Sequence, residues 1–453
     1  MTIALTLDLG KFISELRYQG IPKEAIPFIH TAFADCVGVM VAGARDPAPQ
    51  LLKSMLAPAG DEATLLVGEG RASALDAAWI NGTAAHALDF DDVAQRGGHP
   101  SAVMVPAILA EAEAIGASGE QMVLAYAAGY ETFAELTRRD PDQHQTKGWH
   151  PTGILGNIGA AAACASLRAL DAEKSAMAIA LSASQSSGLM SNFGTMTKPF
   201  HAGRAAHAGV VSARLAGAGF TAALDALEHP PGFLAAVSLG GRIDVDSPVK
   251  AGKEWQICGG NRLSVKKYPL CYCTHRAIDG MLDLLQMNKV NPEEVERVTV
   301  TLSRRNAALL RYHLPQTGLE AKFSIEFAMA SPLIVGRAGL AELTDDFVRR
   351  PDVQALMKRI VVTLDDRDDP NRPGYAIYDQ VVLETRDGRR LDSGHITNVR
   401  GDHGLPLRRD ELWAKFEGCM QVGNARIPAQ DLFDALMSLD RLPHVRELIG
   451  LMS

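Results

Sequence analysis

Residues 81–101, NGTAAHALDFDDVAQRGGHPS, place two histidines (His86 and His99) and three aspartates (Asp89, Asp91 and Asp92) in a run that is otherwise mostly small or apolar. Carboxylates near a protein interior have pKa values that their surroundings can shift. If residues 86–90 are helical, His86 and Asp89 share one face of the helix, and Asp91 and Asp92 turn elsewhere. We expect this stretch to be the centre of the fold and of a chemical site.

A basic residue followed by proline occurs three times, as His99-Pro100, His150-Pro151 and Lys198-Pro199, and a helix-like run follows each pair. Proline is favoured at the first position of a helix, and the residue before it is extended. His99, His150 and Lys198 are therefore expected to be N-caps, beside unpaired N–H groups that attract anions. If the three ends converge, they can receive an acid with several carboxylates, and neutral histidines there can act as bases. The alternative is that these pairs only begin helices, with basic residues placed there by chance.

The composition is that of a globular protein with no general attraction for polyanions. The chain has 453 residues, 47% of them hydrophobic and 22% charged, with a formal net charge of −8. Nucleic acid and anionic membranes are therefore not expected partners. No apolar run is expected to reach the roughly 18 residues of a membrane span, and the first residues lack a signal-peptide pattern. Six scattered cysteines favour a reduced, cytoplasmic protein without a zinc site.

The hydrophobic pattern predicts a mainly α fold with an α+β part. Residues 7–260 repeat apolar residues at helical spacing, as in a multihelical bundle. Residues 295–305, 359–369 and 378–394 alternate as strands, and Asp387-Gly388 predicts a hairpin turn in the last of them. We predict an all-helical domain from residues 1–263 and 397–453, with a smaller α+β lid domain, 264–396, inserted in it. A cleft between the domains is the default site.

Further basic residues extend the candidate anion site. His201 and Arg204 follow Lys198 and are spaced i, i+3 from each other, so they share a helix face. Lys266 begins the α+β region, where a lysine can close over an anionic ligand. For a single lysine the alternative is a solvated surface position.

The aspartates also permit a metal interpretation, which we do not favour. Asp91, Asp92 and Gln95 partly match the Asp-rich magnesium motif of helical terpenoid synthases, but the spacing fits no established ligand pattern and no second metal motif is evident. Helix capping and hydrogen bonding to backbone are expected for at least one of Asp91 and Asp92.

Four ordered motifs, NGTAAHALDFDD…HPS, GWHPTGILG, TKPFHAGRAAHAG and VKKYP…THRAID, resemble the MmgE/PrpD family over nearly the whole chain. That family includes 2-methylcitrate dehydratase, cis-aconitate decarboxylase and iminodisuccinate epimerase. The resemblance implies a helical domain with an inserted lid, a homodimer, no metal, no organic cofactor, and small di- or tricarboxylate substrates.

The resemblance also implies roles for particular residues. Asp89, His99, His150, Lys198 and Lys266 match the family's active-site positions, with His99 and His150 as proton-transfer groups.

Two departures disfavour a decarboxylase. Val93 stands where the decarboxylase-like motif has a threonine, and Phe327 stands where that branch has a tyrosine. Both changes remove a hydroxyl, and a site built around a hydrogen bond loses strongly when one partner is missing.

These observations predict an enzyme that removes or delivers a proton at a carbon next to a carboxylate. Lys198, Lys266 and helix N-termini would bind the carboxylates, with Arg204 and His201 as further substrate-binding candidates, and Asp89 would orient a histidine. We rank a 2-methylcitrate dehydratase-like reaction first, an epimerase or isomerase second and a decarboxylase third. A magnesium-dependent terpenoid synthase and a non-catalytic carboxylate-binding protein are the remaining alternatives.

Overall fold

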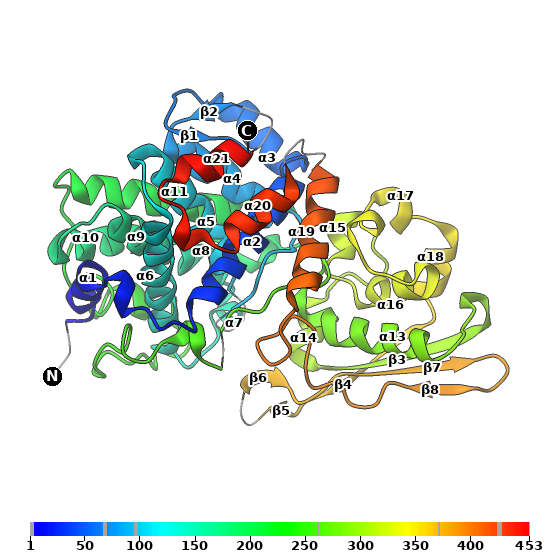
Figure 1. Ribbon diagram of the computed structural model, residues 1–453. Helices are drawn as coiled ribbons and strands as arrows, with labels where there is room; N and C mark the ends of the chain where they lie inside the picture. Colours follow the sequence, from blue (N-terminus) through cyan, green and yellow to red (C-terminus); the bar gives the residue numbers. More distant parts are fainter. Residues whose placement is uncertain are drawn as a thin grey trace. The chain divides into compact units, whose positions relative to one another are not determined.

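The computed structural model describes residues 4–66, 70–94, 98–260, 262–369, 372–423 and 428–452. The chain forms two compact units, one comprising Met1–Val265 with Arg408–Ser453 and the other Lys266–Leu407 (Figure 1). Helices dominate the first unit and a small sheet lies in the second, so the predicted fold class, mainly α with an α+β part, is confirmed.

The first unit is a multihelical bundle with one short hairpin, β1 (Ala63–Thr64) and β2 (Arg71–Ala72). Its helices are α1 (Leu5–Glu15), α2 (Ile26–Gly43), α3 (Pro47–Leu56), α4 (Ala74–Ala87), α5 (Pro100–Ile115), α6 (Gly119–Arg138), α7 (His144–Lys147), α8 (Pro151–Ile154), α9 (Gly156–Leu167), α10 (Ala172–Ala183), α11 (Thr197–Gly217), α12 (Phe233–Val237), α19 (Arg409–Gly423), α20 (Ala429–Leu436) and α21 (Val445–Met452).

Small residues let the central helices approach closely. A side chain at Gly82 of α4 would place its Cβ 2.9 Å from the Cα of Gly203 in α11, so neither helix tolerates a larger residue at this crossing without moving. This close packing brings the C-terminal end of α4 and the N-terminal part of α11, which carry several candidate site residues, into fixed proximity.

Two sequence expectations for this unit need correction. Residues 218–260 are mostly irregular rather than helical, with α12 as their one α-helix among the described residues, in a segment that contains Pro230-Pro231 and several glycines. An apolar run of spanning length also exists, because α2 has 18 residues and a mean hydropathy of 1.5. Of that run 78% is buried inside the protein, as is usual for a core helix.

The second unit packs helices against a four-stranded sheet of order β4-β3-β7-β8. β3 runs parallel to β4 and antiparallel to β7, and the β7–β8 pair is the predicted hairpin, with Gly388 in its turn at a φ of 87°. The elements are α13 (His275–Met287), β3 (Val295–Ser303), α14 (Arg304–Leu309), α15 (Gly318–Ala321), α16 (Ile325–Val335), α17 (Asp345–Val348), α18 (Pro351–Met357), β4 (Ile360–Asp365), β5 (Asp368–Asp369), β6 (Arg372–Ala376), β7 (Gln380–Thr385) and β8 (Arg390–Asp392).

One hydrophobic core fills the second unit. The inward residues of β3 alternate with outward ones, and Val298, Val300 and Leu302 pack with α13 and α16, which lie over the sheet in Figure 1. Residues 397–407 belong to this unit, where the Arg400 guanidinium bonds to Asp279 and Asp283 of α13.

Candidate active site

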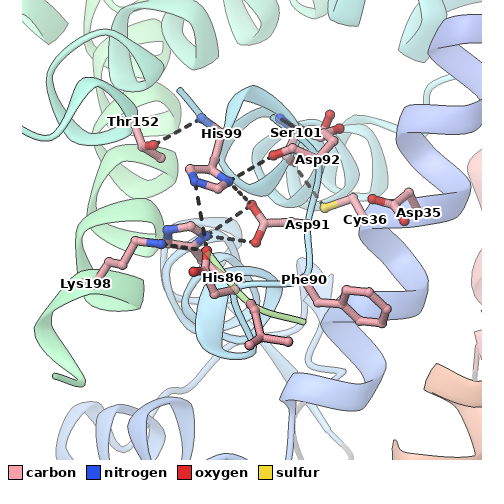
Figure 2. A network of polar contacts seen from close by, with 12 residues as sticks. Asp35, Cys36, His86, Phe90, Asp91, Asp92, His99, Ser101, Thr152 and Lys198 are labelled. Carbon is pink, nitrogen blue, oxygen red and sulfur yellow. Dashed lines mark hydrogen bonds and ion pairs between the residues drawn. The ribbon is translucent and has the colours of Figure 1, made fainter. Parts of the chain in front are cut away.

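His99 is the N-cap of α5, as the His-Pro pair predicts. Its backbone N–H donates to Thr152 Oγ1 at 3.1 Å, and its ring Nδ1 lies 2.9 Å from both the Asp92 carbonyl oxygen and Asp91 Oδ2 (Figure 2). Both partners accept hydrogen bonds, so Nδ1 carries a proton. The other ring nitrogen, Nε2, lies 4.0 Å from Asp89 Oδ1. The His99 ring therefore lies between the carboxylates of Asp91 and Asp89.

His86 lies in the last turn of α4 and bonds to Asp91 rather than sharing a face with Asp89. The helix ends at Ala87, and Asp89 adopts the left-handed conformation with a φ of 51°, so the helical spacing assumed for residues 86–90 is wrong. The sharp reversal brings Asp91 back to the helix end, where its carboxylate lies 2.9 and 3.1 Å from His86 Nδ1. Asp91 thus accepts from two imidazoles.

Lys198 forms a buried ion pair with Asp89. Its Nζ lies 2.6 Å from Asp89 Oδ1, and both side chains are about 5% exposed. Lys198 is not the N-cap of α11, because that helix begins at Thr197 and Met196 is the cap. Pro199 therefore occupies the third helical position, where a missing N–H still costs nothing. The ammonium group also lies 5.0 Å from the centre of the Phe193 ring.

His150 is the N-cap of α8, a single turn that breaks from α9 at Leu155. Its Nδ1 lies 3.2 Å from Nδ1 of His201 in α11, so one ring donates and the other accepts. The rings of His86 and His150 stack at 5.7 Å, and those of His99 and His150 meet edge-on at 6.3 Å. The three segments that contain a basic residue followed by proline do converge. We call the group that they form with α4 the imidazole cluster, and it consists of His86, Asp89, Asp91, His99, His150, Lys198 and His201.

Burial keeps three of these imidazoles neutral at pH 7. It lowers the pKa of His86 to about 3, with Lys198 and His99 adding to the effect and Asp91 opposing it. Burial, His86 and Lys198 hold the pKa of His150 well below its usual range, and burial with Lys198 lowers the pKa of His201 to about 4. Burial raises the pKa of Asp91, but the two imidazoles outweigh burial and hold that pKa well below its usual value. Asp91 is therefore ionised.

Asp92 has a structural position, as expected for one aspartate of the pair. Its Oδ1 accepts from the Ser101 backbone N–H at 3.4 Å, in the first turn of α5. Burial and the neighbouring Asp35 raise the pKa of Asp92 well above its usual range. Lys415 of α19 pairs with Asp35 at 2.5 Å and donates to the Phe90 carbonyl at 2.7 Å.

A metal ion would compete with contacts that already exist in this cluster. His86, Asp89, Asp91 and His99 each offer one donor atom, and these atoms lie within 4.8 Å of one another. The Lys198 ammonium neutralises Asp89, however, and Asp91 accepts hydrogen bonds from both rings. The terpenoid-synthase interpretation requires Asp91 and Asp92 to bind magnesium. Asp91 instead accepts from two imidazoles, and Asp92 accepts from the Ser101 backbone N–H. Its third residue, Gln95, lies outside the described residues.

The remaining predicted site residues lie apart or in the second unit. Arg204 donates to His207 Nδ1 at 2.9 Å and lies 5.6 Å from the centre of the Trp79 ring, so its described contacts are not with the imidazole cluster. The i, i+3 spacing of His201 and Arg204 does not give them common partners. His201 contacts His150, whereas Arg204 contacts His207 and Trp79. Lys266 is the first residue of the second unit and is 1% exposed.

The two positions that differ from the decarboxylase branch are both buried. Phe327 packs against Phe347 in the hydrophobic core of the second unit. A hydroxyl at this position would therefore change the packing of that core. Val93 pairs through its backbone with Ser264 at 2.9 and 2.8 Å.

The sequence interpretation assigned no catalytic role to His86 or Asp91. Both lie within residues 81–101, but their contact depends on the left-handed turn at Asp89. An aspartate can adopt that conformation, and nothing in the spacing of residues 86–91 specifies it.

Comparison with known proteins places this geometry in a family. Residues 7–246 match the MmgE/PrpD N-terminal domain, and residues 268–432 match the MmgE/PrpD C-terminal domain. The chain belongs to the MmgE/PrpD family.

Similar curated proteins include the cis-aconitate decarboxylase of Mus musculus, 25% identical over 379 residues that cover 81% of this chain and 76% of that protein. The cis-aconitate decarboxylase of Homo sapiens is 26% identical over 351 residues, which cover 75% of this chain and 71% of that protein. The cis-aconitate decarboxylase of Aspergillus terreus (strain NIH 2624 / FGSC A1156) is 22% identical over 481 residues, which cover 99% of this chain and 96% of that protein. The protein is accordingly an enzyme of the lyase type.

Proposed function

We propose that the protein transfers a proton at a carbon next to a carboxylate in a small di- or tricarboxylic acid, without a metal or organic cofactor. The observation that carries the proposal is the juxtaposition of neutral, buried imidazoles with the Lys198 ammonium in a cluster of low exposure. Lowered pKa values keep His86, His150 and His201 neutral at pH 7, so Lys198 is the cation that these three rings surround.

His99 is the proposed base. Its Nδ1 donates to Asp91, so Nε2 would be the atom that takes the proton, and the imidazolium formed would be stabilised by Asp91 at 2.9 Å and by Asp89 at 4.0 Å. The negative charge that develops on the substrate carboxylate would be stabilised by Lys198 and by the N-terminal ends of α5 and α11.

His150 is the proposed second proton-transfer group. It lies among His86, His201 and Lys198, and burial with those groups depresses its pKa, so a protonated His150 gives its proton up readily. It would protonate a departing hydroxyl group or the opposite face of the carbon.

Two reactions are specific candidates. Dehydration of a 2-methylcitrate-like acid is the reaction that the sequence motifs favour. Decarboxylation of cis-aconitate is favoured by the names of the relatives, and the burial of Phe327 in a core removes one of two arguments against it. Epimerisation of an iminodisuccinate-type acid uses the same groups and is a third. The homodimer, the cytoplasmic location, the lid role of the second unit and substrate binding by Lys266 also remain proposals from the resemblance.

A substrate panel in deuterated water tests the proposal. The protein is dialysed against a chelator, incubated with 2-methylcitrate, citrate, cis-aconitate and a chiral aminodicarboxylate precursor, and followed by NMR. We expect one acid to be converted, with solvent deuterium at carbon in the product or, through the reverse reaction, in recovered substrate. No conversion of any acid would contradict the proposal, as would activity that disappears with the chelator and returns with a divalent metal.

A further inference from the structure

His86 is a buried titratable group that the proposed reaction leaves unused. It is 1% exposed, and its Nε2 has no hydrogen-bond partner among the residues that the structure describes. Its Nδ1 lies 2.9 Å from Asp91 Oδ1 and 3.1 Å from Asp91 Oδ2. A buried imidazole whose one described hydrogen bond is to a carboxylate has a reason to be there beyond packing.

The carboxylate of Asp91 lies between two rings. Oδ2 accepts from His99 Nδ1 at 2.9 Å, and the ring centres of His86 and His99 are 4.4 Å apart. Asp91 is fully buried, so each of its oxygens depends on these ring N–H groups to offset lost hydration. If the donor at His86 were removed, Asp91 would reorient or draw a proton from elsewhere.

The geometry points to His86 as a positioning residue: it holds Asp91, and Asp91 together with the Asp92 carbonyl oxygen fixes the orientation and the Nδ1–H tautomer of His99, so that His99 Nε2 faces the substrate. This inference rests on the proposed role of His99 as the base. At metal sites, loss of a group that orients an imidazole or its carboxylate typically lowers activity by about 10- to 100-fold, and we expect an effect of the same order here.

A matched pair of variants separates this role from packing. In His86→Asn the side-chain amide N–H stands near the position of Nδ1 and can still donate to Asp91. In His86→Phe the ring is kept but the donor is lost. His86→Gln, whose amide lies near the position of Nε2, is a second variant without the Nδ1 donor, and it retains a polar side chain if His86→Phe does not fold.

The first readout is the ¹⁵N spectrum of histidine-labelled protein, with the His99 signals assigned by their loss in His99→Gln. We expect the Nδ1–H tautomer of His99 in the wild type and in His86→Asn, and a mixture of tautomers in His86→Phe and His86→Gln. Retention of a pure Nδ1–H tautomer in a folded variant without the donor would overturn the inference. This spectrum needs no substrate, so it decides the inference even if every acid of the panel is inert and the proposed function fails.

The second readout is turnover of the acid that the panel identifies. We expect kcat to fall about 10- to 100-fold in His86→Phe and His86→Gln with KM changed only a few-fold, and His86→Asn to recover most of the loss. Equal loss of kcat in His86→Asn and His86→Phe would show that Nε2 or the ring itself is required, and would overturn the positioning role.

Discussion

At the scale of single residues, Asp89 and Lys198 form the contact on which anion binding is expected to depend. Asp89 adopts a left-handed backbone, which is uncommon for residues other than glycine and clusters at functional sites. Its carboxylate neutralises the Lys198 ammonium, so under the proposed function a substrate carboxylate would share that ammonium with Asp89. The ion pair also holds the Lys198 side chain in place.

Substitution of this pair separates stability from binding. Lys198→Met leaves the Asp89 charge buried without its counter-charge and should lower the free energy of unfolding by about 3 to 5 kcal/mol in urea titrations. Asp89→Asn in the same protein keeps a residue that tolerates the left-handed turn and should restore most of that stability. Binding of the acid, measured by calorimetry, should stay weak in the double variant. Equal instability of the single and double variants would show that the pair is not coupled.

At the scale of elements, α6 anchors the irregular segment that leads to the second unit. Glu131 of α6 is fully buried and accepts from the backbone N–H groups of Gln256 and Ile257, each at 3.0 Å. Burial raises the pKa of Glu131 from 4.5 to about 7, although those two hydrogen bonds lower it. The anchoring therefore depends on pH in the neutral range.

The sign of this dependence follows from linkage. Below about pH 4.5 Glu131 is protonated in both the folded and the unfolded chain. Between pH 4.5 and 7 the unfolded chain loses the proton first, so stability falls as the pH rises, by a total of about 3 kcal/mol.

Glu131→Gln cannot ionise and should flatten this part of the profile of unfolding free energy against pH. Glu120→Gln, at an exposed position of the same helix, is the control and should follow the wild type. A Glu131→Gln profile as steep as that of the wild type would contradict the assigned pKa shift.

Local patterns predicted the elements well where the cause was local. His99 and His150 cap helices because proline follows each of them, and Gly388 turns the hairpin because it can adopt a positive φ. Contacts that depend on the packing of distant elements were not predictable. Arg204 lies against Trp79, and Asp91 rather than Asp89 bonds to His86, because the crossing of α4 with α11 and the reversal after α4 decide which atoms meet.

At the scale of the whole molecule, the two parts of the first unit that flank the second unit in the sequence both contact residues 90–93. Ser264, just before the second unit begins, pairs with Val93, and Lys415, shortly after it ends, donates to the Phe90 carbonyl. The same short turn carries Asp89, Asp91 and Asp92. Within the first unit, this turn is therefore held by the residues that flank the second unit in the sequence.

The central claim is that buried imidazoles move the proton while cationic groups bind the acid. The most direct measurement compares kcat with the Kd of the substrate in His99→Gln, with His229→Gln, an exposed position outside the cluster, as the control. We predict that kcat falls about 10²- to 10⁴-fold in His99→Gln while Kd changes only a few-fold, and that the control matches the wild type. A His99→Gln enzyme that retains its turnover, or that loses affinity and turnover equally, would contradict the account.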